Sequence, residues 1–287
     1  MKERETVKFI REWGNELTGY KFGEELNIQL VKGIEQGYSD YAEVRAEKRK
    51  ELHVSGAYAW VKGNHIEDQV ARELQVMGID FKKEKAGYSW EYLSFAEPKE
   101  KYLFLIRNIS IIKGKSTNPT LDITNPENYL VEKSKINTEV DFDELKGSKQ
   151  GTFKFVDLPF IPLSTDDESI EKLKKEYKHF YILTYSIQPE TQMLMSIDLW
   201  MPEFISNHKV DMIQIDSLTG YIGQTGADVN IGAISELVHV AEEGFSGATP
   251  AFEFTSFEEV AEETSGTPAE HGIEQNKEKK KKTRKFY

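Results

Sequence analysis

The sequence has no cysteine and no long apolar run. Without thiols, its 287 residues can form no disulfide, no zinc–thiolate or iron–sulfur site and no cysteine nucleophile. No apolar stretch approaches the ~18 residues of a transmembrane helix. The opening KERETVKFIREW lacks the apolar region of a signal peptide. These absences predict a cytoplasmic protein.

The chain also has fewer positively than negatively charged residues. The chain has 37 Lys and Arg against 49 Asp and Glu, which gives a net charge of −12. A field of this sign repels phosphate, so it argues against a general affinity for nucleic acid without excluding a local basic groove. The same balance suits binding to a basic protein surface or the imitation of DNA.

Composition divides the chain into three regions. Residues 1–55 are expected to form helices joined by glycine breaks, since apolar residues such as Leu26, Leu30 and Ile34 recur at helical spacing. Residues 56–235 hold most of the aromatic and β-branched residues and form the predicted α+β core. This core can be divided into two similar β-rich halves near residues 115–150.

The core contains two predicted sets of strands. The first set covers 79–87, 88–96 and 101–112, the second covers 180–188, 192–201 and 210–217, and the helix DDESIEKLKKEYKHF leads into the second. Stretches 92–106 and 183–197 align with Pro98 on Pro189, and both predict an antiparallel hairpin. Two ordinary hairpins with similar turns would explain the match, and so would a gene duplication. The predicted fold class is α+β, with a helical N-terminal region, two β-hairpin-containing antiparallel units flanked by helices, and a disordered C-terminal tail.

The tail, residues 236–287, differs in composition from the rest. Nine glutamates and no Lys or Arg lie between Glu236 and Glu270, and KEKKKKTRKFY then reverses the charge. Such a segment buries too little apolar surface to offset its ordering entropy, which predicts disorder. Its spaced phenylalanines are candidate partner-binding residues, and a solubilising tail is the alternative. They are Phe245, Phe252, Phe254 and Phe257.

The stretch GNHIEDQVARELQVMGIDFKK carries His65 and Glu67 as an H-x-E pair. In zinc deaminases this pair needs two cysteines to complete the metal site, and the chain has none. A zincin needs a second histidine one helical turn on, and Gln69 follows instead. Capping is the simpler explanation: Asn64 is expected as the N-cap, Glu67 completes a capping box, and Gly78 ends the helix. The predicted buried stripe is Ile66, Val70, Leu74 and Met77.

An alternative interpretation is a restriction-endonuclease-like core. It requires a helix with a carboxylate, followed by strands bearing an Asp and a Glu-x-Lys that hold Mg²⁺. Glu67 and Glu91 are its candidate catalytic carboxylates, and Arg107 could approximate part of the set. KYLFLIRN contains no Glu-x-Lys, so such a core would be degenerate. Mg²⁺ is expected as a cofactor only under this alternative.

Two further sets of polar residues are candidates for nucleic-acid or metal binding. Lys82, Lys83, Lys85 and Arg107 could contact nucleic acid under the same alternative, or the lysines could protect an exposed edge strand. Three aspartates and two histidines could gather around a divalent ion, although such residues more often cap strands or face solvent. They are Asp198, Asp211, Asp216, His179 and His208. No metal site is predicted from them, and GYIGQTG predicts a flexible loop.

Three segments, AWVKGNHIEDQVARELQ, YSWEYLSF and KYLFLIRN, follow one another between about residues 59 and 108. Together they resemble a family of uncharacterised proteins carried by Firmicutes and their phages. The resemblance implies a small cytosolic accessory protein of a phage, prophage or mobile element. It supplies no site residues.

The sequence thus favours a non-enzymatic accessory protein that binds and regulates or inhibits a host or phage protein, with no cofactor. The alternative is a metal-dependent nuclease, or a nucleic-acid-binding protein with a degenerate core. A purely structural virion role is a third interpretation. The sequence predicts no membrane association and no particular oligomeric state.

Overall fold

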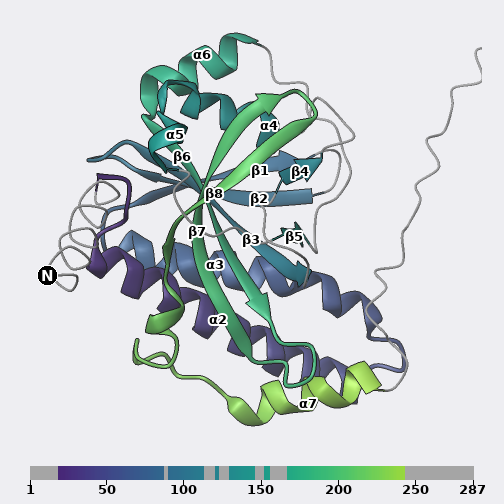
Figure 1. Cartoon of the computed structure of the whole chain (residues 1–287). Helices are drawn as coiled ribbons and strands as arrows, with labels where there is room; N and C mark the ends of the chain where they lie inside the picture. Colours follow the sequence, from purple (N-terminus) through teal and green to yellow (C-terminus); the bar gives the residue numbers. More distant parts are fainter. Residues whose placement is uncertain are drawn as a thin grey trace, which may run out of the picture. The chain divides into compact units, whose positions relative to one another are not determined.

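A computed structural model of the chain describes residues 19–86, 90–112, 120–122, 129–145, 152–155 and 167–242 (Figure 1). The fold is α+β, as predicted, with helices packed on a mixed sheet. None of the helices in these ranges is both long and apolar enough to cross a bilayer. The four tail phenylalanines, Phe245, Phe252, Phe254 and Phe257, lie outside the described residues.

Helix α2, Glu24–Glu51, is continuous through Gly33 and Gly37, so the prediction of helices joined by glycine breaks is wrong over this stretch. Both glycines face α3, Lys62–Gln75, where the two helices approach closely. A Cβ on Gly33 would lie 2.6 Å from Val70 Cα, and one on Gly37 would lie 2.6 Å from the carbonyl oxygen of His65. Glycine is therefore present here because no side chain fits between the helices.

Replacing Gly37 with alanine should destabilise the fold, although alanine favours helices. We expect a loss of about 1–3 kcal/mol in the free energy of unfolding, because the added methyl group meets backbone atoms of α3. Gly63→Ala is the matched control, since no atom lies within 4 Å of a Cβ at that helical position. There alanine should stabilise by about 0.5–1 kcal/mol. Urea unfolding of both variants tests the pair, and equal responses would contradict the close approach.

Helix α3 confirms most of its predicted buried stripe but not its predicted start; Met77, the last residue of that stripe, is only partly buried and lies beyond the end of the helix at Gln75. Ile66, Val70 and Leu74 are fully buried. The short helix η2, Gly56–Val61, runs directly into α3, so Asn64 lies inside the first turn and is not the N-cap. The C-terminus is as predicted: Gly78 has φ +75°, and the Ile79 and Gly78 amides donate to the Leu74 and Gln75 carbonyls.

The sheet joins the two predicted sets of strands. Its order is β1-β2-β3-β6-β7-β8-β4, and β5 pairs with β3. All pairs are antiparallel except β3–β6, which is parallel from Tyr102↔His179 to Asn108↔Tyr185. The strand bounds are β1 Asp80–Ala86, β2 Trp90–Glu97, β3 Tyr102–Ile112, β4 Thr120–Asp122, β5 Thr152–Phe155, β6 His179–Ile187, β7 Leu194–Ser206 and β8 Lys209–Ser217.

Both predicted hairpins are present, as β2–β3 and β6–β7. Their turns share a feature at equivalent positions: Lys101 has φ 59° and Gln192 has φ 56°. Because β3 and β6 run parallel from the same end of the sheet, the two turns lie at opposite ends. Shared turn geometry accounts for the sequence match, and gene duplication stays a prediction.

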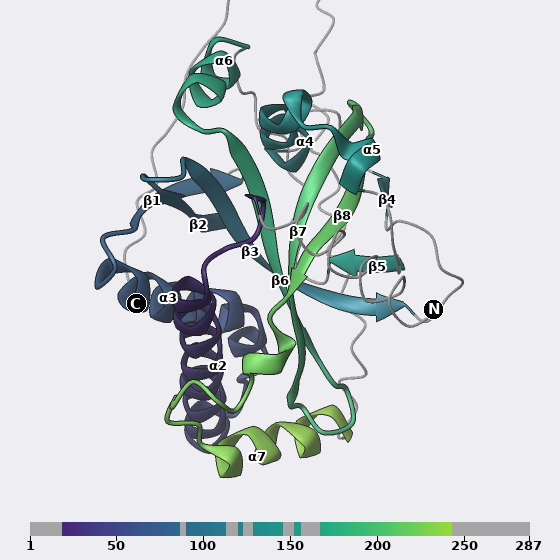
Figure 2. The ribbon, with the colours of Figure 1, turned by 60° about the vertical axis from the view of Figure 1, so that its left-hand side comes forward.

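Helices cover both faces of the sheet (Figure 2). One face packs on α2, α3 and α7, Ile231–Glu242, around residues such as Phe95, Phe104 and Leu183. The other face packs on the connection between β3 and β6, around residues such as Leu105 and Phe180. The helical elements of that connection are α4 Tyr129–Ser134, η3 Lys135–Glu139, α5 Phe142–Leu145 and α6 Asp167–Glu176; of these, α5 packs into the first cluster through Phe142 and Leu145. Helix α7 extends past residue 235, where the tail was predicted to begin.

The glycine-containing loop after η4, Thr219–Tyr221, is held by the buried carboxylate of Glu35 in α2. The Gly223 amide donates to Glu35 Oε1 at 2.6 Å, and the Thr225 hydroxyl donates to Oε2. Gly223 and Gly226 have φ of +76° and +75°, a left-handed conformation that glycine adopts more easily than other residues, so both glycines are needed for the turn. The GYIGQTG stretch is therefore a loop, as predicted, with Glu35 as its anchor.

Candidate functional site

The candidate site lies where the β2–β3 ladder ends. The two strands pair from Glu97↔Tyr102 to Ser94↔Leu105, and both continue beyond that point without pairing to each other. We call this place the β2–β3 fork; it comprises residues 91–93 of β2 and 106–108 of β3. A small pocket of about 20 Å³ opens here, roughly the space of one water molecule. It is lined by Gly63, Asn64, Glu67, Glu91, Ile106, Arg107, Asn108 and Tyr185.

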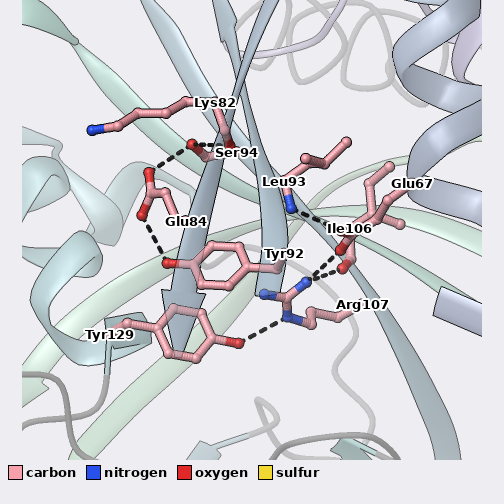
Figure 3. A network of polar contacts seen from close by, with 9 residues as sticks. All are labelled: Glu67, Lys82, Glu84, Tyr92, Leu93, Ser94, Ile106, Arg107 and Tyr129. Atoms are coloured by element: carbon pink, nitrogen blue, oxygen red, sulfur yellow. Dashed lines mark hydrogen bonds and ion pairs between the residues drawn. The ribbon is translucent and has the colours of Figure 1, made fainter. Parts of the chain in front are cut away.

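Glu67 extends from α3 into the fork (Figure 3). Its Oε1 accepts a hydrogen bond from Arg107 Nη1 at 3.0 Å, and its Oε2 accepts one from the Leu93 amide at 2.7 Å. That amide belongs to β2 just beyond the end of the ladder, so the carboxylate takes the place of a strand partner. Both oxygens of Glu67 are therefore engaged by donors of the fork.

Arg107 is the cation of the fork, and it is as deeply buried as its partner. The exposed fractions of the two side chains are 7% for Arg107 and 12% for Glu67. Arg107 Nε donates to the Tyr129 hydroxyl at 2.9 Å, and its guanidinium carbon lies 4.8 Å from the Tyr92 ring centroid and 5.4 Å from that of Tyr129. Figure 3 shows the remaining guanidinium nitrogen directed toward these rings, whose π faces attract a cation.

A second acidic group continues the network on the far side of Tyr92. The Tyr92 hydroxyl donates to Glu84 Oε2 at 2.8 Å, and the Ser94 hydroxyl donates to Glu84 Oε1 at 2.6 Å. Lys133 of α4 forms an ion pair with Glu84 at 2.9 Å, and its side chain is 7% exposed. The buried ion pair Glu67–Arg107 and the partly buried ion pair Glu84–Lys133 thus lie on either side of the Tyr92 ring.

The pKa values of the two carboxylates are shifted in opposite directions. Burial raises the pKa of Glu67 to about 7, against the opposing effects of Arg107 and the Leu93 amide. Burial also acts to raise the pKa of Glu84, but Lys133 and the hydroxyl donors outweigh it and hold this pKa below its usual value. Glu84 therefore carries its charge at neutral pH, whereas Glu67 is close to its midpoint.

The structure brings together some of the predicted site residues. Glu67, Glu91 and Arg107 all line the pocket of the fork. Glu91 is partly exposed and pairs with Lys83 at 3.2 Å. Lys82, Lys83 and Lys85 lie on β1, the strand next to β2, and do not line this pocket.

The structure gives no support to the alternative of a divalent-ion site from Asp198, Asp211, Asp216, His179 and His208. Asp198 accepts a hydrogen bond from Gln214, and Asp216 pairs with Lys21 at 2.9 Å. His179 lies among tyrosine rings, with centroids 5.3 Å from Tyr20 and 5.9 Å from Tyr102. Within the described residues, no three His, Asp or Glu side chains are grouped so that they could hold a metal ion.

Sequence reasoning missed Glu84, Lys133 and Tyr129. Glu84 and Lys133 are partners across 49 positions, and Arg107 and Tyr129 across 22. Glu84 and Lys85 point to opposite faces of β1, as their adjacency predicts. The available signal was Glu84 itself, a charged residue in a predicted strand; the structure places it opposite Tyr92.

Comparison of the chain with protein-family models, with curated proteins and with solved structures gives no match. The resemblance to the Firmicutes and phage family therefore stays a prediction.

Proposed function

We propose that this protein is a non-enzymatic accessory protein of a phage or mobile element, which binds and regulates a partner protein in the cytoplasm. The observation that supports it is the state of Glu67, the carboxylate that a nuclease core would need for its metal. Both of its oxygens accept hydrogen bonds from Arg107 and Leu93. The buried guanidinium also supplies, inside the fork, the positive charge that a metal ion would otherwise bring.

The tail phenylalanines are the proposed contacts to the partner. Phe252 and Phe254 alternate with glutamate, and the surrounding segment has no Lys or Arg, which suits a partner with a basic surface that also has apolar pockets. Coupled ordering of such a segment on its partner is a common binding mode.

Affinity purification of the full chain from its native host, followed by mass spectrometry, tests this proposal. Four Phe→Ser substitutions at 245, 252, 254 and 257 should abolish recovery of the partner. Removal of residues 271–287 alone is the matched control, because it deletes the basic end and keeps every one of these phenylalanines. Truncation should not begin at 236, since Leu237 of α7 is buried in the core. Equal recovery with the four substitutions would refute the role of the tail.

A second candidate is a nuclease or nucleic-acid-binding protein with a degenerate restriction-endonuclease-like core. It is favoured by the order of elements: a helix bearing Glu67, then β1, β2 and β3 in antiparallel order, then β6 parallel to β3. Incubation with single- and double-stranded DNA and RNA at low salt, with Mg²⁺ or Mn²⁺, tests it. Cleavage that Glu67→Gln abolishes and Lys172→Gln, at an exposed position of α6, spares would establish this candidate over the first.

A further inference from the structure

Strand β1 is the outermost strand on its side of the sheet. On the opposite side of the sheet, the outermost strand is β4, which pairs with β8. Strand β5 pairs with residues Ile109–Ile112 at the end of β3. Within the described ranges, no strand pairs with the outer flank of β1, and none of its backbone groups there has a hydrogen-bond partner in a turn or loop. The seven residues Asp80–Ala86 thus present an open backbone edge.

The exposed side chains on this edge are mostly basic, with one exposed ring. Lys82, Lys83 and Lys85 are exposed, and Phe81 is 40% exposed beside the buried ring of Phe95, at a centroid distance of 6.4 Å. The strand has two acidic residues: Glu84 is turned into the network with Lys133, and Asp80 is exposed at the first position of the strand. Alternation along the strand places Phe81, Lys83 and Lys85 on one face and Lys82 on the other.

We propose that the outer flank of β1 is a docking edge for an extended segment of a partner protein in which acidic and apolar residues alternate. Main-chain hydrogen bonds to the open edge would supply affinity, as in other cases of strand addition. Acidic side chains of the segment opposite Lys83 and Lys85 would supply specificity and register, and strict alternation then places its apolar side chains on the other face of the strand. This inference rests on the proposed partner-binding function and names a surface for it.

The same lysines have a competing role, because charged residues on an edge strand also prevent unwanted pairing. The two roles differ in what they require. Protection needs charge of either sign, whereas docking of an acidic segment needs positive charge. Reversing the charge therefore separates them.

The test uses the full chain and two fluorescein-labelled eight-residue peptides, one alternating glutamate with valine and one alternating lysine with valine. Fluorescence anisotropy measures binding, and amide hydrogen exchange over residues 80–86 reports strand addition. The glutamate peptide should bind at least about tenfold more tightly than the lysine peptide and should slow exchange in β1. Combined Lys82→Glu, Lys83→Glu and Lys85→Glu substitutions should reverse this preference.

Lys172→Glu with Lys175→Glu, on exposed positions of α6, is the matched control and should leave the preference unchanged. Thermal unfolding verifies that each variant is folded. Binding of neither peptide to the wild-type chain, or a preference that the β1 substitutions do not reverse, would overturn the docking edge. If the Phe→Ser substitutions in the tail abolish partner capture but the wild-type chain binds neither peptide at β1, the docking edge is refuted and the proposed function is not.

Discussion

Replacing Arg107 with methionine should lower the free energy of unfolding by about 3–5 kcal/mol at pH 8. Methionine fills much of the same space, but it leaves the Glu67 carboxylate buried and without its cation. The Tyr129 hydroxyl loses its donor in the same step. Chemical denaturation of the variant and the wild-type chain at pH 8 gives the difference directly.

Two controls separate this pair from a general effect of charge. Lys83→Met removes a partner of Glu91, but both of those side chains are largely exposed, at 62% and 45%, so the change should stay within about 0.5 kcal/mol. The double variant Glu67→Gln with Arg107→Met removes both buried charges and should recover most of the lost stability. Additive losses in the double variant would mean that the two residues do not act as a pair.

The stability of the fold should also depend on pH through Glu67. Burial raises its pKa in the folded protein to about 7, above the unfolded value of about 4.5. The folded state therefore holds this proton more tightly, so the stabilisation is complete below about pH 4.5 and is lost as pH rises through 7. Measured against Glu67→Gln, which cannot ionise, the wild-type chain should lose roughly 3 kcal/mol over this interval.

The comparison with Glu67→Gln removes the contributions of all other titrating groups. Denaturation of both proteins at pH values from 4.5 to 8 supplies the measurement. A constant difference between them would show that Glu67 keeps its ordinary pKa. A difference that grows in favour of the wild-type chain as pH rises would show that the pair with Arg107 outweighs burial.

Strands β1, β2, β3, β6, β7 and β8 and most of the buried stripe of α3 could be predicted from local pattern alone, whereas β4 could not. Alternating and helical spacing of apolar residues such as Ile66, Val70 and Leu74 reports directly which face is buried. The antiparallel hairpins follow from the turn residues around Pro98 and Pro189. The parallel β3–β6 pair could not be predicted in this way, because its partners are joined by a long connection with little periodicity of its own.

The site was harder to predict because its residues also satisfy simpler explanations. An acidic residue three positions after Asn64 has the spacing of a capping box, so the pattern assigns Glu67 to the helix start. In the structure the helix begins earlier, at Lys62, and the carboxylate is free to enter the fork. Its partner Arg107 lies 40 positions away, a pairing that spacing along one element cannot reveal.

The glycines of α2 show the same limit. Glycine inside a helix costs about 1 kcal/mol relative to alanine, so Gly33 and Gly37 predict interruptions. The compensation is the close packing of α3, which depends on a residue as distant as Val70. Local propensity is outweighed here by a tertiary contact.

Binding of Mn²⁺ to the fork tests the central claim most directly, because that claim assigns the Glu67 carboxylate to Arg107 and Leu93 and not to a metal ion. Electron paramagnetic resonance of Mn²⁺ titrated into the wild-type chain and into Glu67→Gln measures free ion in both. The account predicts superimposable titrations with no stoichiometric site. A one-to-one site in the wild-type chain that is lost in Glu67→Gln would contradict it and restore the nuclease interpretation.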